Sequence, residues 1–340
     1  MPVLVGNMRM LLGLCQAVLV FVLLVLNPAR TSAETGAGRF FLMGDGKIQI
    51  KSARNGREAS VSLLTPDGSL NEEGLCAIDK VFEFPTSEKG EHISPRLLFM
   101  LDYFSDLAAP GKVINLESGY RSPEYNTTLR DAGKIAAKTS VHIDGMALDF
   151  SIVGVDGKGL WNTIRSRDCC GIGNYGGSTV HLDSGKPRFW EAATSKVRTG
   201  ESDYNRRIYL STDFDRYKPG DTVRLSFSSV SDFRFGINHT VAVVGGSEQG
   251  TTVSTSEIRV PDVSNTVPKS EKGDQKSNDC VMINDRKTSR FIYFTVPPDL
   301  RGGRYRVRID FCRKPFEQMP LYTLSNEIEL LGQAPRATVP

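Results

Sequence analysis

Residue types that bind metal ions gather in two short stretches of the sequence. The stretch SVHIDGMALDFSIV, residues 140 to 153, places His142 seven residues before Asp149, and STVHLDSG, residues 178 to 185, contains His181. Two imidazoles and one carboxylate would leave the fourth position of a tetrahedral Zn²⁺ open, which is how proteins hold catalytic zinc. Water bound at that position has a pKa of about 7 and becomes a nucleophile near neutral pH. The pattern therefore predicts a zinc site.

Alternation along two predicted strands explains how these residues could meet. If GMALDFSIV is a strand, its apolar and its small or polar residues point to opposite faces. The core set is Met146, Leu148, Phe150 and Ile152, and the opposite set is Ala147, Asp149 and Ser151. The second strand repeats the design, with Val180 and Leu182 on one face and Thr179, His181 and Asp183 on the other. If the two strands pair, Asp149 and His181 share a polar face, and His142 reaches it from the preceding loop.

Ordinary structural roles are the competing interpretation for every histidine, because a strand histidine is more often a hydrogen-bonded polar residue than a ligand. We assign that interpretation to the other two histidines of the chain. His92 is expected to pack or cap just before a helix, and His239 to lie in a strand of a distal sheet. The surroundings of His142 and His181 favour metal binding instead.

The elements that must position the site are short. KIQIKS and ASVSLLT alternate as strands, and VINLESGYRS reads as a strand that runs into a loop. A helix is predicted to start at Pro95, capped by Ser94, and to end at PGK, with a stripe formed by Leu97, Leu98, Leu101, Phe104 and Leu107. A second short helix is predicted within SPEYNTTLRDAGK and to end at Gly133.

The composition changes near residue 195, with a boundary between 190 and 206. From there the chain alternates strand patterns with Pro-Gly and Gly-Gly turns and shows no helical period, which predicts a β-sandwich of roughly six to eight strands. The insert PDVSNTVPKSEKGDQKSND has the composition of a mobile loop.

The N-terminus carries an export pattern. Arg9 precedes an apolar run from Met10 to Leu26, and NPARTSAETG follows, so we predict a signal peptide over residues 1–33. An uncleaved anchor is the alternative, because the run lies at the lower edge of membrane-spanning length. Cleavage would remove Arg9 and Arg30 and no acid, so the net charge would fall from +3 to +1. This near-neutral product gives no indication of nucleic-acid binding.

Five cysteines lie beyond the predicted signal peptide, where an oxidising compartment would favour their pairing. Cys280 with Cys312 is the first expected pair. The second is Cys76 with Cys169 or Cys170, since adjacent cysteines rarely bond each other.

Three motifs in order, S-G-Y-R-S-P, S-x-H-x-x-G-x-A-x-D and V-H-x-D-x-G, resemble those of the zinc peptidases of bacterial peptidoglycan. This group includes the D-alanyl-D-alanine carboxypeptidases and dipeptidases, the murein endopeptidases and, by fold, the hedgehog signalling domain. The sequence is most similar to the murein endopeptidase K branch, over residues 40 to 192. The resemblance implies an α+β zinc domain with a small antiparallel sheet at residues 34–195. The all-β sandwich, expected at 200–335, lies outside the resemblance and rests on the strand and turn pattern alone.

The resemblance also implies roles for individual residues. His142, Asp149 and His181 would be the zinc ligands, and Arg121 would hold a substrate carboxylate or the polarised carbonyl oxygen, rather than form a surface ion pair. Many relatives carry an acid three residues before the last histidine ligand, where this chain has Ser178. Asp183 is the first candidate for the general base, with orientation of an imidazole as its alternative role.

Glu117 and Asp144 are outside candidates for the base. Tyr120 and Ser140 also match the motifs, and both could be scaffold residues: Tyr120 could pack, and Ser140 could bond to the backbone of the His142 loop.

These expectations combine into an exported, periplasmic or secreted Zn²⁺ peptidase that cuts peptidoglycan cross-links or stem peptides, with zinc-bound water as nucleophile. Peptidoglycan peptides are the expected partners, together with an envelope protein that binds the C-terminal domain. No nucleic acid is expected, and membrane contact only through an uncleaved signal segment. The alternatives are an inactive zinc-containing binding module, favoured by Ser178, and a structural envelope protein whose histidines are incidental.

Overall fold

The computed structural model describes residues 36–86, 91–134, 136–195, 203–245, 250–261 and 280–332. Residues Gly36–Pro340 form one compact unit. The predicted signal peptide at 1–33 and almost all of the polar insert lie outside the described residues. Of the helices that are described, none is both long and apolar enough to cross a bilayer.

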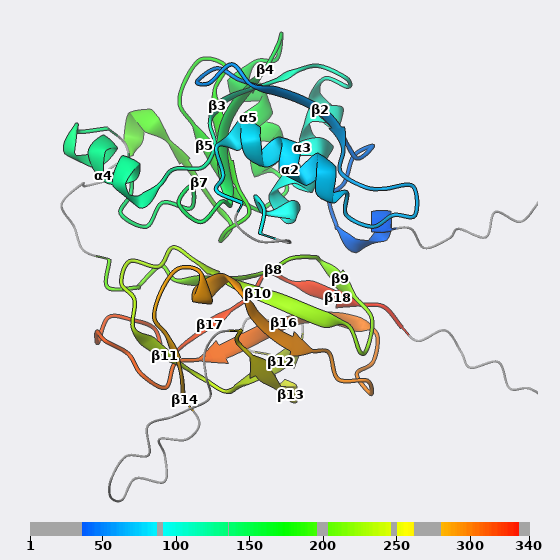
Figure 1. Cartoon of the computed structure of the whole chain (residues 1–340), viewed down its shortest axis with the longest axis vertical. Helices are drawn as coiled ribbons and strands as arrows, with labels where there is room; N and C mark the ends of the chain where they lie inside the picture. Colours follow the sequence, from blue (N-terminus) through cyan, green and yellow to red (C-terminus); the bar gives the residue numbers. More distant parts are fainter. Residues whose placement is uncertain are drawn as a thin grey trace, which may run out of the picture. The chain divides into compact units, whose positions relative to one another are not determined.

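Residues 36–195, the N-terminal segment, combine helices with one sheet (Figure 1). The helices are α2 (Glu72–Phe82), α3 (Pro95–Ala108), α4 (Pro123–Asp131) and α5 (Gly157–Arg165). The strands are β1 (Lys47–Ser52), β2 (Glu58–Ser62), β3 (Ile114–Ser118), β4 (Ala147–Ile152), β5 (Gly171–Asn174), β6 (Val180–Asp183) and β7 (Arg188–Glu191).

The sheet of the N-terminal segment has seven strands in the order β2-β1-β3-β4-β6-β5-β7. The β1–β3 and β5–β7 pairs are parallel and the others are antiparallel. The sheet is therefore larger than expected and mixed: four of its six strand pairs are antiparallel, as predicted, and the other two are parallel. The β1–β3 pair can be parallel because the chain passes through β2, α2 and α3 between these strands, and the β5–β7 pair because β6 brings the chain back between them.

Local capping signals account for the helix starts. Ser94 accepts a hydrogen bond from the Leu97 amide at 3.4 Å, and Pro95 occupies the first helical position, as predicted. Ser122 caps α4 in the same way at 3.1 Å. The sequence reading did not include α2 and α5, which begin after Asn71 and Asp156 respectively; both side chains accept from an amide three residues on.

One face of the sheet is the core of the N-terminal segment. Side chains of α2, α3 and α5 pack there against alternate residues of the central strands, including Leu148, Phe150, Val180 and Leu182. The residues between them in sequence, Asp149 and His181, therefore project from the opposite face. Met146 departs from the predicted core set, because it packs in a separate small cluster with Val141 and Ala147.

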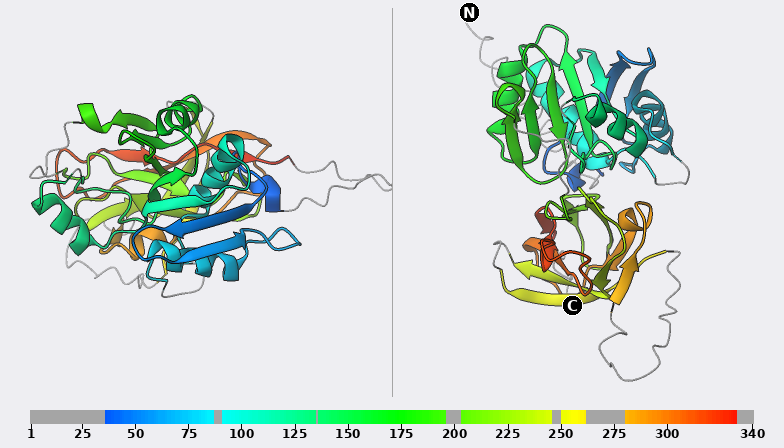
Figure 2. Two further views of the ribbon diagram at one scale, coloured as in Figure 1. Left: turned by 90° about the horizontal axis from the view of Figure 1, so that it is seen from above. Right: turned by 90° about the vertical axis from the view of Figure 1, so that its left-hand side faces the viewer.

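Residues 203–332, the C-terminal segment, contain strands and no α-helix among the residues described (Figure 2). The strands are β8 (Tyr209–Thr212), β9 (Arg216–Tyr217), β10 (Thr222–Ser228), β11 (Phe235–Asn238), β12 (Thr240–Gly245), β13 (Thr252–Arg259), β14 (Cys280–Ile283), β15 (Ile292–Thr295), β16 (Gly303–Asp310), β17 (Tyr322–Leu324) and β18 (Ile328–Leu330). They exceed the predicted number. One sheet has the order β8-β10-β15-β13-β12-β16-β18-β9, with β17 beside β16, and β11 pairs with β14.

Two disulfides are present among the residues that the structure describes. The predicted Cys280–Cys312 bond is confirmed. The expected bond from Cys76 to Cys169 or Cys170 is wrong, because Cys76 is a free thiol on α2, and the adjacent Cys169 and Cys170 bond each other just before β5.

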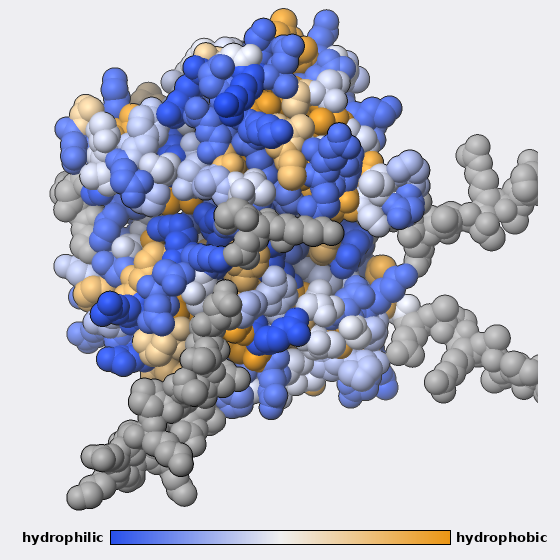
Figure 3. Space-filling model, viewed as in Figure 1, coloured by the Kyte–Doolittle hydropathy of each residue, from blue (hydrophilic) through white to orange (hydrophobic). Residues whose placement is uncertain are grey.

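Hydrophilic side chains predominate on the face shown in Figure 3, and the hydrophobic ones occur there in small groups. This distribution is ordinary for a protein that contacts water.

Candidate metal centre

The pairing of β4 with β6 builds two-thirds of the site. In their antiparallel register Asp149 lies directly opposite His181. Directly opposite residues of an antiparallel pair have side chains close enough to interact. Consequently the carboxylate of Asp149 and the imidazole of His181 approach to 2.9 Å, between Oδ1 and Nδ1.

His142 comes from the turn of residues 141–145, which precedes β4. Its Nδ1 lies 2.7 Å from the carbonyl oxygen of Gly119, and since a carbonyl can only accept, Nδ1 donates. This hydrogen bond fixes the tautomer and leaves Nε2 as the lone-pair nitrogen. Nε2 lies 3.3 Å from His181 Nδ1 and 3.3 Å from Asp149 Oδ1.

The three atoms fit a tetrahedral metal ion. Bonds of about 2.0–2.1 Å to zinc separate ligand atoms at tetrahedral angles by roughly 3.3–3.4 Å. The observed separations are 3.3, 3.3 and 2.9 Å. All three residues are buried, and their ligand atoms form one of three groups of His, Cys, Asp and Glu within the described residues that could hold a metal ion. The donor set of two imidazoles and one carboxylate suits Zn²⁺.

Hydrogen bonds already occupy the other two groups. In the first, His92 contacts Asp79 with Nδ1 at 2.7 Å and Glu72 with Nε2 at 3.0 Å, so that both ring nitrogens are occupied. His92 thus has a structural role, as expected, although Ser94 and not His92 caps α3. In the second, Asp102 and Asp106 accept hydrogen bonds from backbone amides of residues 44–46.

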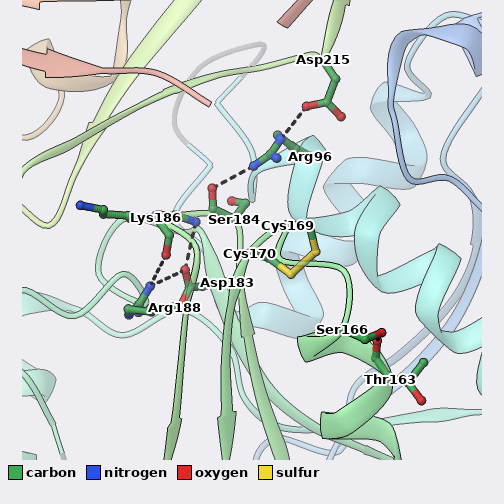
Figure 4. The surroundings of a disulfide bond; sticks show 11 residues. Arg96, Thr163, Ser166, Cys169, Cys170, Asp183, Ser184, Lys186, Arg188 and Asp215 are labelled. Carbon is green, nitrogen blue, oxygen red and sulfur yellow. Dashed lines mark hydrogen bonds and ion pairs between the residues drawn. A yellow bond between two sulfur atoms is a disulfide. The ribbon is translucent and has the colours of Figure 1, made fainter. Parts of the chain in front are cut away.

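Asp183 lies on the same strand face as His181 and is fully buried. Its Oδ2 accepts from His181 Nε2 at 2.8 Å and from Arg188 Nη2 at 2.7 Å. Its Oδ1 accepts from the Gly185 amide and from Arg188 Nη1, both at 3.0 Å (Figure 4). A carboxylate offers about four lone-pair sites, and here four donors fill them. These contacts are those of a residue that orients His181.

Arg121 is buried and binds the metal-site carboxylate directly. Its Nη2 lies 2.6 Å from Asp149 Oδ2, and its Nε donates to Ser118 Oγ at 3.0 Å. Tyr175 contributes from the turn after β5: its hydroxyl donates to Asp149 Oδ1 at 3.0 Å. Arg121 and Tyr175 together therefore hold the carboxylate in place.

Buried charges shift the acid–base properties of the site. Burial opposes ionisation of Asp149, but His142 and His181 outweigh it and hold the pKa of Asp149 well below its ordinary value. Burial likewise opposes ionisation of Asp183, and the Arg188 charge and the His181 hydrogen bond lower its pKa in spite of this. Both groups are therefore carboxylates at neutral pH.

The two imidazoles differ. Burial lowers the pKa of His142, which favours its neutral, ligand form. Burial also acts to lower the pKa of His181, but hydrogen bonds to Asp149 and Asp183 raise it overall. A metal ion would have to displace the His181 proton.

The other predicted site residues do not join the centre. Ser178 and Glu117 are exposed. Asp144 is buried, but its carboxylate pairs with Arg286 and accepts from the Ser229 amide at 2.9 Å. Tyr120 packs edge-on against Phe84, at 5.3 Å between ring centroids, as expected for a scaffold residue. The role of Ser140 stays a prediction.

Sequence reasoning assigned no role to Trp190, which lies 5.7 Å from the His181 ring and 5.1 Å from the Tyr175 ring, between centroids. Two glycines of β5 make room for the side chains of Trp190 and Asp183. A Cβ on Gly173 would lie 2.2 Å from Trp190 Cζ2, and one on Gly171 would lie 2.1 Å from Asp183 Oδ2. In the sequence, the G-x-G pattern of β5 just before the strand of His181 was the signal that large side chains pack against this strand.

Comparisons with known proteins find relatives for the segment that holds the candidate site. The family model described as peptidoglycan L,D-endopeptidase MepK matches residues 47–190, which include all three candidate ligands. Peptidoglycan L,D-endopeptidase MepK of Escherichia coli K12 is 30% identical over 144 residues, which are 42% of this chain and 79% of that protein.

A probable peptidoglycan L,D-endopeptidase MepK of Haemophilus influenzae is 37% identical over 79 residues, 23% of this chain and 42% of that protein. A solved cohesin–dockerin complex of Clostridium thermocellum covers 36% of this chain and 99% of its own at 14% identity, but its TM-score of 0.19 carries no argument about the fold.

Proposed function

The chain belongs to the family of the peptidoglycan L,D-endopeptidase MepK and is a peptidase, and from this membership we propose that it hydrolyses peptide bonds in peptidoglycan with a zinc ion held by His142, Asp149 and His181. One observation carries the proposal. Within the segment that matches the family, three ligand atoms from a turn and two strands converge at the spacing of a tetrahedral ion.

A bound Zn²⁺ would supply an activated water molecule and polarise the carbonyl of the bond to be cut. The protein residues prepare the site for it. The Gly119 carbonyl and the Asp183 carboxylate each accept a hydrogen bond from one imidazole, so that His142 presents Nε2 and His181 presents Nδ1. Such outer hydrogen bonds fix ring orientation and raise the basicity of the ligands.

Arg121 is proposed to stabilise negative charge on the substrate. Its guanidinium already lies beside the site at Asp149 Oδ2, and an arginine fork can bind a carboxylate or a developing oxyanion. Tyr175 keeps its proton, because burial raises the pKa of its hydroxyl, so it stays a hydrogen-bond donor in the same region.

For Asp183 we propose the orienting role instead of the general-base role. The four donors around it leave no lone pair for a proton from water. In this assignment Asp183 does not replace the acid that many relatives carry at the position of Ser178.

The finer architecture and location belong to the same proposal. We infer a hedgehog and D-alanyl-D-alanine-peptidase-like fold for residues 34–195, a β-sandwich for 200–335, and export through residues 1–33 to the cell envelope, where peptidoglycan peptides are the substrate. The family membership supports the first and last of these inferences, and the all-β composition of the C-terminal segment supports the second.

Digestion of purified, cross-linked muropeptides tests the function. Zinc-loaded protein is expected to convert dimers to monomers, His142→Ala is expected to lose this conversion and the bound zinc together, and mass spectrometry of the products identifies the bond. Dimers that survive prolonged treatment with zinc-loaded wild type would leave the inactive binding module as the better assignment.

A further inference from the structure

Two arginines of the C-terminal segment bind the turn that carries His142. We call residues 141–145 the metal loop. Arg286 forms an ion pair with Asp144, and Arg290 donates from Nη2 to the carbonyl oxygen of Ile143 at 3.2 Å. The Ser229 amide makes a third contact with the metal loop, because it donates to the Asp144 carboxylate at 2.9 Å.

These contacts act on a tightly wound piece of chain. Within the metal loop, the Asp144 and Met146 amides both donate to the carbonyl of Val141, at 3.1 Å, and the Ile143 amide donates to that of Ser140 at 3.0 Å. Asp144 is only two residues beyond His142 and is 7% exposed. Because backbone hydrogen bonds join residues 140–146, contacts that hold Asp144 also restrain the backbone of His142.

Hydrogen bonds hold the turn that carries the two arginines. This short turn ends in the 3₁₀ helix η4 (Thr288–Arg290). Asp285 caps this turn by accepting from the Thr288 amide at 2.7 Å, and Ser289 Oγ donates to the Arg286 carbonyl at 2.8 Å. Ser226 of β10 donates to the Arg290 carbonyl at 2.9 Å, which fastens the turn to the large sheet. The turn can thus hold the metal loop from outside.

A second connection reaches the strand of the other imidazole. Arg96 of α3 is buried, pairs through Nε with the buried Asp215 at 2.7 Å, and donates through Nη1 to the Ser184 carbonyl at 3.1 Å (Figure 4). Ser184 follows Asp183, the residue that orients His181. Both imidazoles are therefore linked to the C-terminal segment through short chains of contacts.

The family match ends at residue 190, so Asp215, Ser229, Arg286 and Arg290 all lie beyond it. We propose that the C-terminal segment of this protein is part of the scaffold of its metal site, and that Arg286 and Arg290 are positioning residues for His142. The inference rests on the proposed zinc site, because it assigns the two arginines a role in placing one of its ligands.

The test compares full-length wild type with Arg286→Ala, Arg290→Ala and the double variant. Arg304→Ala is the matched control, since Arg304 is also an arginine of the C-terminal segment paired with an acid, Glu327, but it is more exposed and away from the metal loop. Circular dichroism and thermal unfolding establish that each variant is folded before its metal binding is compared.

Zinc affinity is measured by competition with a chromogenic chelator. Loss of a residue that supports a metal ligand typically weakens metal binding by roughly 10- to 100-fold. We expect about 10-fold for each single variant and more for the double variant, with a changed visible spectrum of the Co²⁺-substituted protein. The expected value for Arg304→Ala is within about twofold of wild type. Wild-type zinc affinity and an unchanged Co²⁺ spectrum in a folded double variant would overturn the proposal.

Hydrogen exchange of the metal-free proteins separates this inference from the function itself. Amides of the metal loop are expected to exchange faster in the double variant and at the wild-type rate in Arg304→Ala. If wild type binds no zinc or cuts no peptide, the proposed function fails, and the exchange rates still show whether the arginines hold the loop. Equal exchange in wild type and double variant would refute the positioning role even in an active enzyme.

Discussion

Replacement of Asp183 by asparagine discriminates between the two roles that this residue could have. Asparagine keeps the shape but removes the charge, and its amide group cannot accept at both ends. Of the four hydrogen bonds to the carboxylate, the two from Arg188 are charge-assisted, and the one from His181 orients a proposed zinc ligand. The Asp183 carboxylate packs closely against Gly171, where a Cβ would lie 2.1 Å from Oδ2.

The magnitude follows from these contacts. A hydrogen bond to a charged group contributes about 1.5–3 kcal/mol, and about 1.4 kcal/mol corresponds to a tenfold change in a binding constant. If the lost hydrogen bond leaves the His181 ring poorly oriented, zinc affinity should fall by roughly 10- to 100-fold. Turnover at saturating zinc should stay within about tenfold of wild type, because the water-activating groups remain.

The assay is cleavage of a defined cross-linked dimer across a series of buffered free zinc concentrations, together with chelator competition. Wild type and Asp183→Asn should then differ mainly in the zinc concentration that gives half-maximal activity. Loss of a general base would instead lower the rate by roughly 10²- to 10⁴-fold at every zinc concentration. That result, combined with unchanged zinc affinity, would refute the orienting role.

Three other changes test the fold around the site. His92→Gln should destabilise the protein by about 2 kcal/mol at pH 6. The hydrogen bond to Asp79 raises the pKa of His92 in the folded protein. The stability that His92 contributes is therefore complete below about pH 6.5 and is lost as the pH rises through the raised pKa. Urea unfolding at pH 6 and 9 checks this, and an equal loss at both would contradict it. Gly173→Ala should lower stability by about 1–3 kcal/mol through the clash with Trp190, whereas Gly38→Ala, with open space around it, should be neutral; thermal unfolding showing equal midpoints would be inconsistent with the close contact. Cys280→Ser opens a 32-residue cross-link and should destabilise by about 3–4 kcal/mol, measured in denaturant without reductant; a change below about 1 kcal/mol would count against a structural disulfide.

The strand pair at the centre of the site was predictable because period-two alternation is a local signal. The patterns around Asp149 and His181 each showed an apolar and a polar face, and the observed register joins them as expected. The ligand set and its metal stay predictions, supported by the spacing of the three donor atoms.

Other parts depended on contacts between distant residues. The acceptor for His142 is a backbone carbonyl 23 residues earlier, which no side-chain pattern reveals. Strand β5 reads GIGN, and its glycines weaken any strand signal even though neighbouring strands hold it in the sheet. Helix α5 also contains two glycines, so its capping residue Asp156 was the one clear local sign of it.

The glycines of β5 also restrict which sequences can share this site. A larger residue at Gly171 would have to displace Asp183, and one at Gly173 would have to displace Trp190, so each glycine is tied to the side chain that covers it. When uncharacterised chains are searched for the same chemistry, a G-x-G placed shortly before V-H-x-D, with a tryptophan soon after, is therefore a more selective criterion than the histidine motif by itself.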